Sequence, residues 1–190
     1  MTNYNPFKEL ALRVGDQKRS MNWYQNQIKN LRSMNTNVNS MLTGHRDLRA
    51  QIVPGGLYLF QYDAKHKDTL PYWDKLPLVF PFRKVPDGFY GLNLHYLPYG
   101  LRFKLMSALI EVTHNNPDVK MRAQLSWSIL NASSKFVGVG ACVKHYLNDH
   151  VQSRFLNIPQ EQWLSASMMP IEQFKGATKE KVWNQSRKFI

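Results

Sequence analysis

The sequence contains a single cysteine, Cys142, among its 190 residues. An internal disulfide bond is therefore excluded, and a reducing compartment is the expected environment. No apolar run approaches the roughly 20 residues that a membrane-spanning helix needs. The N-terminus also lacks the apolar core of a signal peptide. These absences predict a soluble protein that is made in the cytosol and has no membrane partner.

Motifs of the common enzyme classes are missing as well. The sequence has no Ser-His-Asp arrangement, no dinucleotide fingerprint and no paired-carboxylate site. The small residues at 137–140 lack the spacing of a phosphate-binding loop. His145 and His150 have no paired cysteines for a zinc site. The acids and histidines of residues 63–74, together with His95, match no metal or nuclease pattern, so we expect no enzyme activity, no metal and no cofactor.

Acidic residues are scarce relative to basic ones. The chain has 25 Lys and Arg against 13 Asp and Glu, a formal net charge of +12 at pH 7. This excess predicts attraction to a polyanion such as a nucleic acid. The same charge also suits a protein that avoids self-association or pairs with an acidic assembly partner. Both explanations stay open at this stage.

Residues 55–98 are rich in side chains that favour strands. Three apolar runs, at 57–62, 76–82 and 89–97, are separated by Pro, Gly and Asp. Residues 84–88 are predicted to form a hairpin turn, in which Pro86 presets φ and Gly88 accepts a positive φ. A long loop between the first two runs, at residues 63–75, is followed by a tight hairpin and a short strand. This order resembles a small SH3-like β-barrel. Residues 151–158 alternate and are expected to close it.

Both flanks of this region carry helical patterns. Residues 141–146 are expected to form a short helix with Cys142 as a buried apolar residue. The longer helices are expected to begin at Pro6, Ser20, Leu101, Val119, Pro159 and Thr178. The predicted fold class is therefore α+β: a small SH3-like β-barrel with an inserted helical pair and helical N- and C-terminal segments.

The domain organisation follows from this pattern. We expect a basic helical arm at residues 1–54, which packs on a partner or on the barrel rather than folding by itself. The β-barrel core would span residues 55–190, with its strands at 55–97 and 151–158. Helices 101–132 would be inserted between these strands, and the C-terminal helices would occupy residues 160–190.

Basic residues of the arm, the hairpin turn and the first inserted helix are the predicted DNA contacts. Those of the inserted helix lie off its apolar stripe, and at least two of the three groups are expected to share one face. The candidates are Arg13, Lys18, Arg19, Lys29, Arg32, Arg83, Lys84, Arg102 and Lys104.

Aromatic and polar residues of the central stretch form a second set of candidates. Tyr72 and Trp73 are suited to stacking on the bases of a nucleic acid, and Trp73 is also expected to pack against the barrel. His95 is expected to order the preceding loop through a hydrogen bond. The candidates for stacking or loop ordering are Tyr72, Trp73, Asp74, Asn93 and His95.

A series of short motifs resembles the DNA end protector proteins of T-even-like tailed phages and their marine relatives. The motifs are residues 62–63 (YD), 70–74 (LPYWD), 91–97 (GLNLHYL), 153–155 (SRF) and 186–188 (SRK). The resemblance covers residues 55–190, with a looser match around Trp23 and Tyr24. It implies a virion protein that is made in the cytoplasm of the host bacterium, and it carries over no individual active residue.

Two functions remain open. The resemblance implies a protein that binds and protects the end of the packaged genome, at head completion or at the head–tail junction. Its partners would be a double-stranded DNA end and other virion proteins of the portal, neck, tail or baseplate. The alternative is a purely structural neck, tail or baseplate subunit without DNA contact, whose positive charge matches acidic neighbours.

Overall fold

The computed structural model describes residues 5–15, 17–32, 41–43, 47–114, 118, 121, 124, 128–129 and 140–188. Its helices are α1 (Pro6–Val14), α2 (Met21–Arg32), α3 (Tyr99–His114), α5 (Trp163–Met168) and α6 (Lys179–Arg187). Its strands are β1 (Leu48–Arg49), β2 (Leu57–Leu59), β3 (Trp73–Asp74), β4 (Leu78–Val85), β5 (Gly88–Asn93), β6 (Val143–Leu147), β7 (Phe155–Ile158) and β8 (Phe174–Lys175). The predicted inserted helix at 119–132 lies almost entirely outside the described residues.

Side-chain caps explain where the two terminal helices begin. The Asn5 side chain accepts a hydrogen bond from the backbone N–H of Lys8 (3.0 Å), and Pro6 occupies the first turn of α1. The Thr178 hydroxyl accepts one from the backbone N–H of Lys181 (3.3 Å) at the start of α6. The predicted starts of both helices are confirmed.

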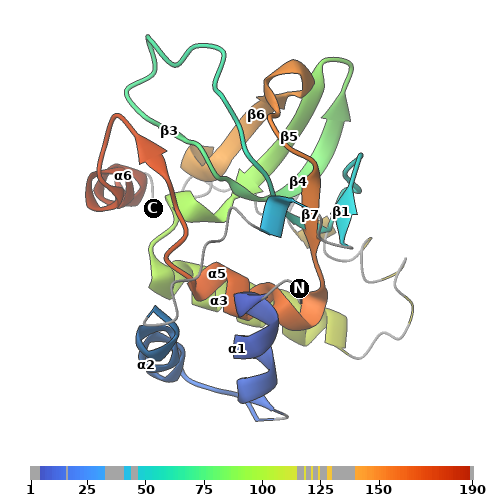
Figure 1. Cartoon of the computed structure of the whole chain (residues 1–190), viewed down its shortest axis with the longest axis vertical. Coiled ribbons are helices and arrows are strands. Elements are labelled where there is room, and N and C mark those ends of the chain that lie inside the picture. The colour runs from blue at the N-terminus through green and yellow to red at the C-terminus, as the bar shows by residue number, and fades with distance from the viewer. Residues whose placement is uncertain are drawn as a thin grey trace.

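Six strands form one antiparallel sheet in the order β1-β7-β2-β4-β5-β6, and β3 pairs with β8 in a separate ribbon (Figure 1). This mixture of helices and antiparallel strands confirms the α+β class. The predicted closing strand, β7, lies inside the sheet between β1 and β2. Within the described chain the sheet stays open, so the predicted SH3-like barrel is not confirmed.

One face of the sheet packs against helices. α1, α2 and α3 all contact α5, and Figure 1 shows these four helices at one end of the molecule, with the β4–β5 hairpin at the other. Phe7 of α1 and Leu31 of α2 are buried in the same apolar core as Phe80 of β4 and Trp163 of α5. Apolar packing therefore holds the N-terminal helices against the sheet.

The other face of the sheet carries a second core, built largely from aromatic rings. Phe60 lies at its centre, with its ring 5.1 to 6.4 Å from the rings of Tyr62, Phe89, Tyr146 and Phe155. An isolated bridge between Tyr62 and Val151 joins the chain after β6 to the chain after β2. The sheet therefore curls around Phe60, and we call the side that faces Phe60 the concave side.

The β4–β5 hairpin turns where the sequence predicts, with Val85 paired to Gly88 across Pro86 and Asp87. The predicted reason for Gly88 is wrong, because this glycine does not have a positive φ. A Cβ at Gly88 would instead collide with the backbone oxygen of Tyr146 on β6. Glycine is required here because β5 and β6 approach each other closely.

Two other local predictions are wrong. Residues 143–147 form strand β6 rather than a helix, because β5 supplies partners for their backbone hydrogen bonds. The third predicted strand ends at Asn93, whose side chain accepts a hydrogen bond from the backbone N–H of His95 (2.9 Å) and starts a 3₁₀ turn at Leu94–Tyr96. Asn93 and His95 consequently do not alternate with Leu94 and Tyr96 between two faces, and all four are buried.

The buried carboxylate of Asp74 joins three distant parts of the chain. Its Oδ2 lies 2.7 Å from Nδ1 of His95 and accepts a hydrogen bond from the Asn93 amide (3.1 Å). Its Oδ1 accepts hydrogen bonds from the backbone N–H groups of Leu76 (3.1 Å) and Gln173 (3.2 Å). Burial opposes ionisation of Asp74, but His95 and the hydrogen-bond donors outweigh burial and hold its pKa below the ordinary value.

Arg102 lies inside the protein, so its prediction as an exposed DNA contact is wrong. The side chain is completely buried, and its guanidinium donates hydrogen bonds to the backbone oxygens of Leu97 (2.6 Å), His95 (3.0 Å) and Ser167 (3.3 Å). It also lies 3.5 Å from Glu172. Burial lowers the pKa of the guanidinium, and Glu172 opposes that shift. Arg102 therefore connects α3 to the turn before it and to the C-terminal segment.

Replacing Asp74 by Asn should destabilise the protein strongly. Asp74→Asn removes the buried charge and replaces one of the two accepting oxygens by an NH2 donor, and each buried donor left without its acceptor typically costs about 1–3 kcal/mol. The free energy of unfolding, measured in urea at pH 7, tests this. Asp63→Asn is the matched control, since Asp63 pairs with Lys67 on the surface (2.8 Å) and such pairs contribute little. Equal effects of the two substitutions would contradict the role given to Asp74.

The lowered pKa of Asp74 also predicts how stability changes with pH. As the pH falls, the unfolded chain takes up the proton before the folded chain does. The contribution of the carboxylate is therefore fully present above the unfolded-state pKa of about 3.9 and is lost as the pH falls through the lower pKa of the folded state. Between pH 6 and pH 3 the wild-type protein should lose more unfolding free energy than Asp74→Asn. Parallel pH curves would show that Asp74 does not contribute in this way.

Two substitutions on α3 should separate a buried cation from an exposed one. Arg102→Met leaves the backbone oxygens of Leu97 and Ser167 without their donor and removes the buried cation that faces Glu172, so we expect a loss of about 3–5 kcal/mol. Lys104→Met changes an exposed side chain on the same helix and should alter stability by less than about 0.5 kcal/mol. Chemical denaturation of both variants provides the measurement. A stable Arg102→Met protein would mean that the buried contacts of Arg102 contribute little.

Candidate nucleic-acid interface

The predicted cations of the arm and of α3 lie at the helical end of the molecule. Lys18, Lys29 and Lys104 are exposed, and none of them forms an ion pair with another described residue. The rings of Tyr24 and Phe103 lie 6.3 Å apart and join α2 to α3. The side chain of Arg32 lies outside the described residues. This end therefore presents unpaired lysines from two neighbouring segments.

The two arginines at this end are already engaged within the protein. Arg13 forms an ion pair with Glu9 one helical turn away (2.6 Å). Arg19 donates a hydrogen bond to the backbone oxygen of Val14 (3.2 Å), and its guanidinium lies 5.2 Å from the ring centroid of Trp23. Their charge remains near the surface, but part of their hydrogen-bonding capacity is used internally.

The predicted cations of the hairpin project from opposite faces of the sheet. Both are exposed, and the pairing of β4 with β5 places Arg83 opposite Tyr90 and Lys84 opposite Phe89. Residues directly opposite each other share a face, whereas neighbours along one strand point to different faces. Because Phe89 belongs to the aromatic core, Lys84 lies on the concave side and Arg83 on the outer side.

Arg83 begins a row of stacked side chains that crosses three strands. Its guanidinium carbon lies 4.5 Å from the ring centroid of Tyr90. The rings of Tyr90 and His145 are 4.6 Å apart and only 11° from parallel, and Tyr90 and His145 are register partners in β5 and β6. Nε2 of His145 lies 3.3 Å from the Asp87 carboxylate at the turn. We call Arg83, Tyr90 and His145 the cross-strand row.

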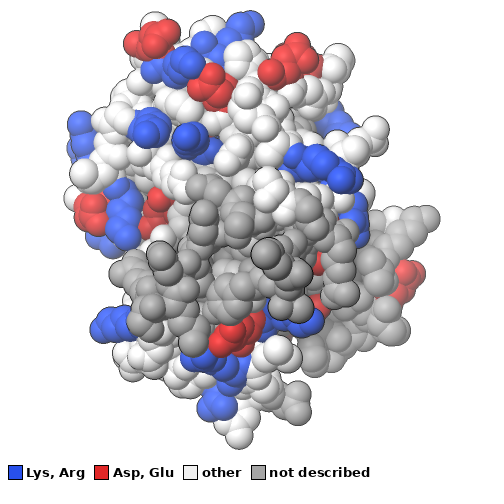
Figure 2. All heavy atoms as spheres, in the orientation of Figure 1, with Lys and Arg blue, Asp and Glu red and all other residues white. Residues whose placement is uncertain are grey.

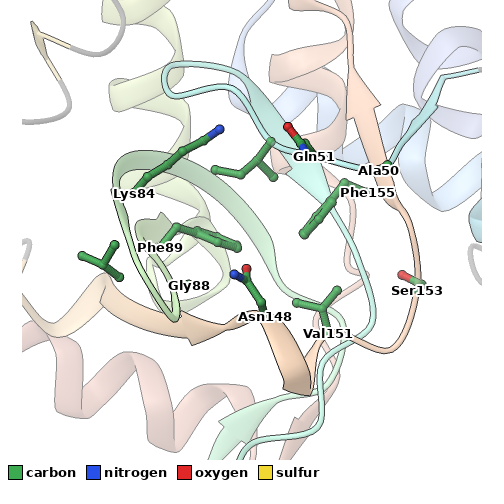
Figure 3. A pocket seen from close by; sticks show the side chains of 11 residues that line it. Ala50, Gln51, Lys84, Gly88, Phe89, Asn148, Val151, Ser153 and Phe155 are labelled. Carbon is green, nitrogen blue, oxygen red and sulfur yellow. The ribbon is translucent and has the colours of Figure 1, made fainter.

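A hollow of about 500 Å³ opens on the concave side, beside Lys84. Figure 3 shows the rings of Phe89 and Phe155 facing the hollow, with Lys84 and Gln51 at its rim. The walls come from the hairpin, from residues 50–52 and from residues 148–155. The hairpin thus contributes to two surfaces: the stacked row outside and this hollow inside.

The predicted groups of cations do not all meet on one face. The arm and the hairpin lie at opposite ends of the molecule (Figure 1). On the face shown in Figure 2, acidic side chains are interspersed among basic ones rather than excluded from a single basic patch. An extended polyanion would therefore meet the hairpin cations or the arm cations first, depending on which end of the protein approaches it.

Tyr72 and Trp73 both pack against the protein and are partly buried. The Tyr72 ring lies 6.0 Å from that of Tyr96 and 6.4 Å from that of Phe174. Trp73 packs against the aromatic core, and its backbone pairs with Lys175 of β8. Stacking of these two rings on DNA stays a prediction. Of the other candidates in this set, Asp74, Asn93 and His95 form the buried hydrogen-bonded group described above.

Sequence reasoning missed Tyr90 and His145. Tyr90 follows Phe89 in the third predicted strand, and successive side chains of a strand point to opposite faces. This pattern indicates that Tyr90 faces outward, but it does not show which side chains stack on its ring. His145 was predicted to lie in a helix, so the sequence pattern did not show that it pairs with Tyr90 across two strands.

The described part of the chain offers neither a metal site nor a membrane-spanning helix. It holds no group of three or more His, Cys, Asp or Glu side chains arranged as a metal site. Among the described helices, none has the length and apolar character needed to cross a bilayer.

Comparison with protein families gives one match. The family model described as Phage T4 terminal DNA protecting protein matches residues 12–188. Comparisons with curated proteins and with solved structures gave no match. The matched segment runs from α1 to the end of α6 and includes the hairpin, the cross-strand row and the Asp74 group. The chain therefore belongs to the Phage T4 terminal DNA protecting protein family.

Proposed function

We propose that this protein is a component of a tailed-phage virion that binds the end of the packaged genome and shields it, at head completion or at the head–tail junction. The family match over residues 12–188 is the observation that carries this proposal. The net charge of +12 supports it, since duplex DNA attracts basic proteins through its phosphates. The protein acts by occupying the DNA end, so the role requires no catalytic group.

The hairpin end is the part of the surface that we assign to the DNA. The Tyr90 ring holds the Arg83 guanidinium by stacking, which orders the side chain before DNA arrives. A guanidinium stacked in this way keeps its N–H edge available for bidentate hydrogen bonds to a phosphate. Lys84 supplies a second positive charge on the opposite face of the same strand. Cations on both faces of β4 suit a DNA strand whose end passes over the hairpin.

A DNA end also differs from the rest of a duplex because it exposes the face of a terminal base pair. Aromatic side chains stack on bases with little dependence on sequence. The Tyr90 ring is stacked between Arg83 and His145, so the exposed side chains at the two ends of the row, the Arg83 guanidinium and the His145 ring, are the ones that can stack on a terminal base. This combination of ring and cation supports recognition of an end rather than of a base sequence.

End binding can be measured with a linear duplex labelled at one end. Affinity should fall steeply between ~50 and ~200 mM salt, because each phosphate contact contributes about 0.9 to the slope of log K against log salt. A covalently closed circle of the same sequence should compete less well than the linear duplex. An absence of binding at low salt would contradict the proposal, and equal competition by the circle would contradict recognition of the end.

Charge reversal at the hairpin should weaken binding more than the same reversal at the helical end. Arg83→Glu/Lys84→Glu removes two proposed phosphate contacts and should reduce the salt slope by about 2. Lys18→Glu/Lys29→Glu changes the net charge equally at the opposite end and serves as the matched variant. Affinity of both proteins for the linear duplex, measured across salt concentrations, gives the comparison.

Two results would redirect the assignment. A larger loss in the arm variant would place the DNA at the helical end. Unchanged DNA affinity in both variants, with failed assembly into particles, would favour the alternative of a structural neck, tail or baseplate subunit whose basic side chains meet acidic protein.

A further inference from the structure

The hollow on the concave side has the size and lining of a site for a small ligand. Its volume of about 500 Å³ falls within the ~300–1,000 Å³ of typical small-molecule sites. Its floor is apolar and comes from Ile52, Phe89, Val151 and Phe155. A floor of this kind favours a flat apolar group and disfavours a charged one.

The rim of the hollow is polar, and its side chains are unused within the described protein. Gln51, Asn148 and Lys84 line the hollow from three separate segments, and all three are exposed. None of these side chains forms a hydrogen bond or an ion pair with another described residue. The two amides can each donate and accept hydrogen bonds, and the ammonium of Lys84 provides a positive charge at one rim. Figure 3 shows Lys84 and Gln51 on one side of the opening and Asn148 on the other.

We propose that this hollow binds the terminal nucleotide of the DNA end in an unpaired state. The base would lie against the apolar floor, the amides of Gln51 and Asn148 would meet its polar edge, and Lys84 would contact its phosphate. This inference rests on the proposed function and adds the position of the last nucleotide. The chemistry matches because every base combines an apolar face with a hydrogen-bonding edge, and its phosphate is anionic.

The geometry of the hairpin favours a single unpaired nucleotide over an intact base pair. Residues of the hairpin wall the hollow on one side, and residues 148–155 wall it on the other, so a separated base fits between them. Lys84 is adjacent to Arg83 along β4, and the two project from opposite faces. A DNA strand that leaves the hollow past Lys84 would therefore carry its next phosphates across the β4–β5 hairpin, toward the cross-strand row.

Fluorescence of 2-aminopurine, which reports on the stacking of the base that carries it, tests this inference. One duplex carries the probe at its terminal position, and a second carries it at an internal position. A loop of DNA closes the far end of each duplex, so that only one open end is present. Binding should change the fluorescence of the terminal probe and leave the internal probe unchanged. A site that receives a peptide of another virion protein instead would leave both probes unchanged.

Two tryptophan substitutions provide the matched comparison. Ala50→Trp fills the hollow from its exposed rim, and Val53→Trp adds the same ring at a nearby residue that is 59% exposed and does not line the hollow. Ala50→Trp should abolish the change in the terminal probe and weaken end binding by about tenfold, the typical effect of losing one stacked base. Val53→Trp should behave as the wild-type protein does. Thermal melting checks that both variants are folded.

The outcomes separate this inference from the function on which it rests. If the wild-type protein binds duplex ends without altering the terminal probe, or if both variants give the wild-type signal, the hollow does not hold the nucleotide and end binding still stands. If the wild-type protein does not bind duplex ends at low salt, both the inference and the proposed function are overturned.

Discussion

The buried carboxylate of Asp74 is the interaction on which the arrangement of this protein depends most. It receives hydrogen bonds from the chain that follows it, from Asn93 at the end of β5 and from the backbone of Gln173, and it faces His95. The backbone oxygen of His95 in turn accepts hydrogen bonds from Arg102 of α3 and from the indole of Trp183 in α6 (2.8 Å). One charged group thereby links the sheet, α3 and the C-terminal helix.

The buried contacts of Asp74 and Arg102 hold the sheet in place, and the β4–β5 hairpin projects from it. The β5–β6 pairing and the aromatic core around Phe60 hold the concave side, while Arg83 and Lys84 remain exposed on the two faces of β4. Cations that hold the fold and cations that face the solvent are therefore separate in this protein. Arg102 belongs to the first kind, which is why the total charge does not by itself identify the DNA-binding residues.

Local patterns in the sequence predict the parts of the fold that depend on neighbouring residues. The caps at Asn5 and Thr178 and the turn at Pro86 and Asp87 are of this kind, because the atoms that form them lie within a few residues. Arg102 was misassigned because Glu172, which faces it, comes 70 residues later in the chain. For the same reason strand β6, and with it the contact of His145 with Tyr90, depends on pairing that local pattern does not show.

Protection of a DNA end from an exonuclease tests the central claim most directly. A linear duplex is incubated with saturating protein and then treated with a processive exonuclease, and a restriction enzyme that cuts an internal site serves as the control. The account predicts that the protein slows digestion from the ends while internal cleavage proceeds at its normal rate. Digestion at the rate seen without protein, or equal inhibition of both enzymes, would contradict protection of the DNA end.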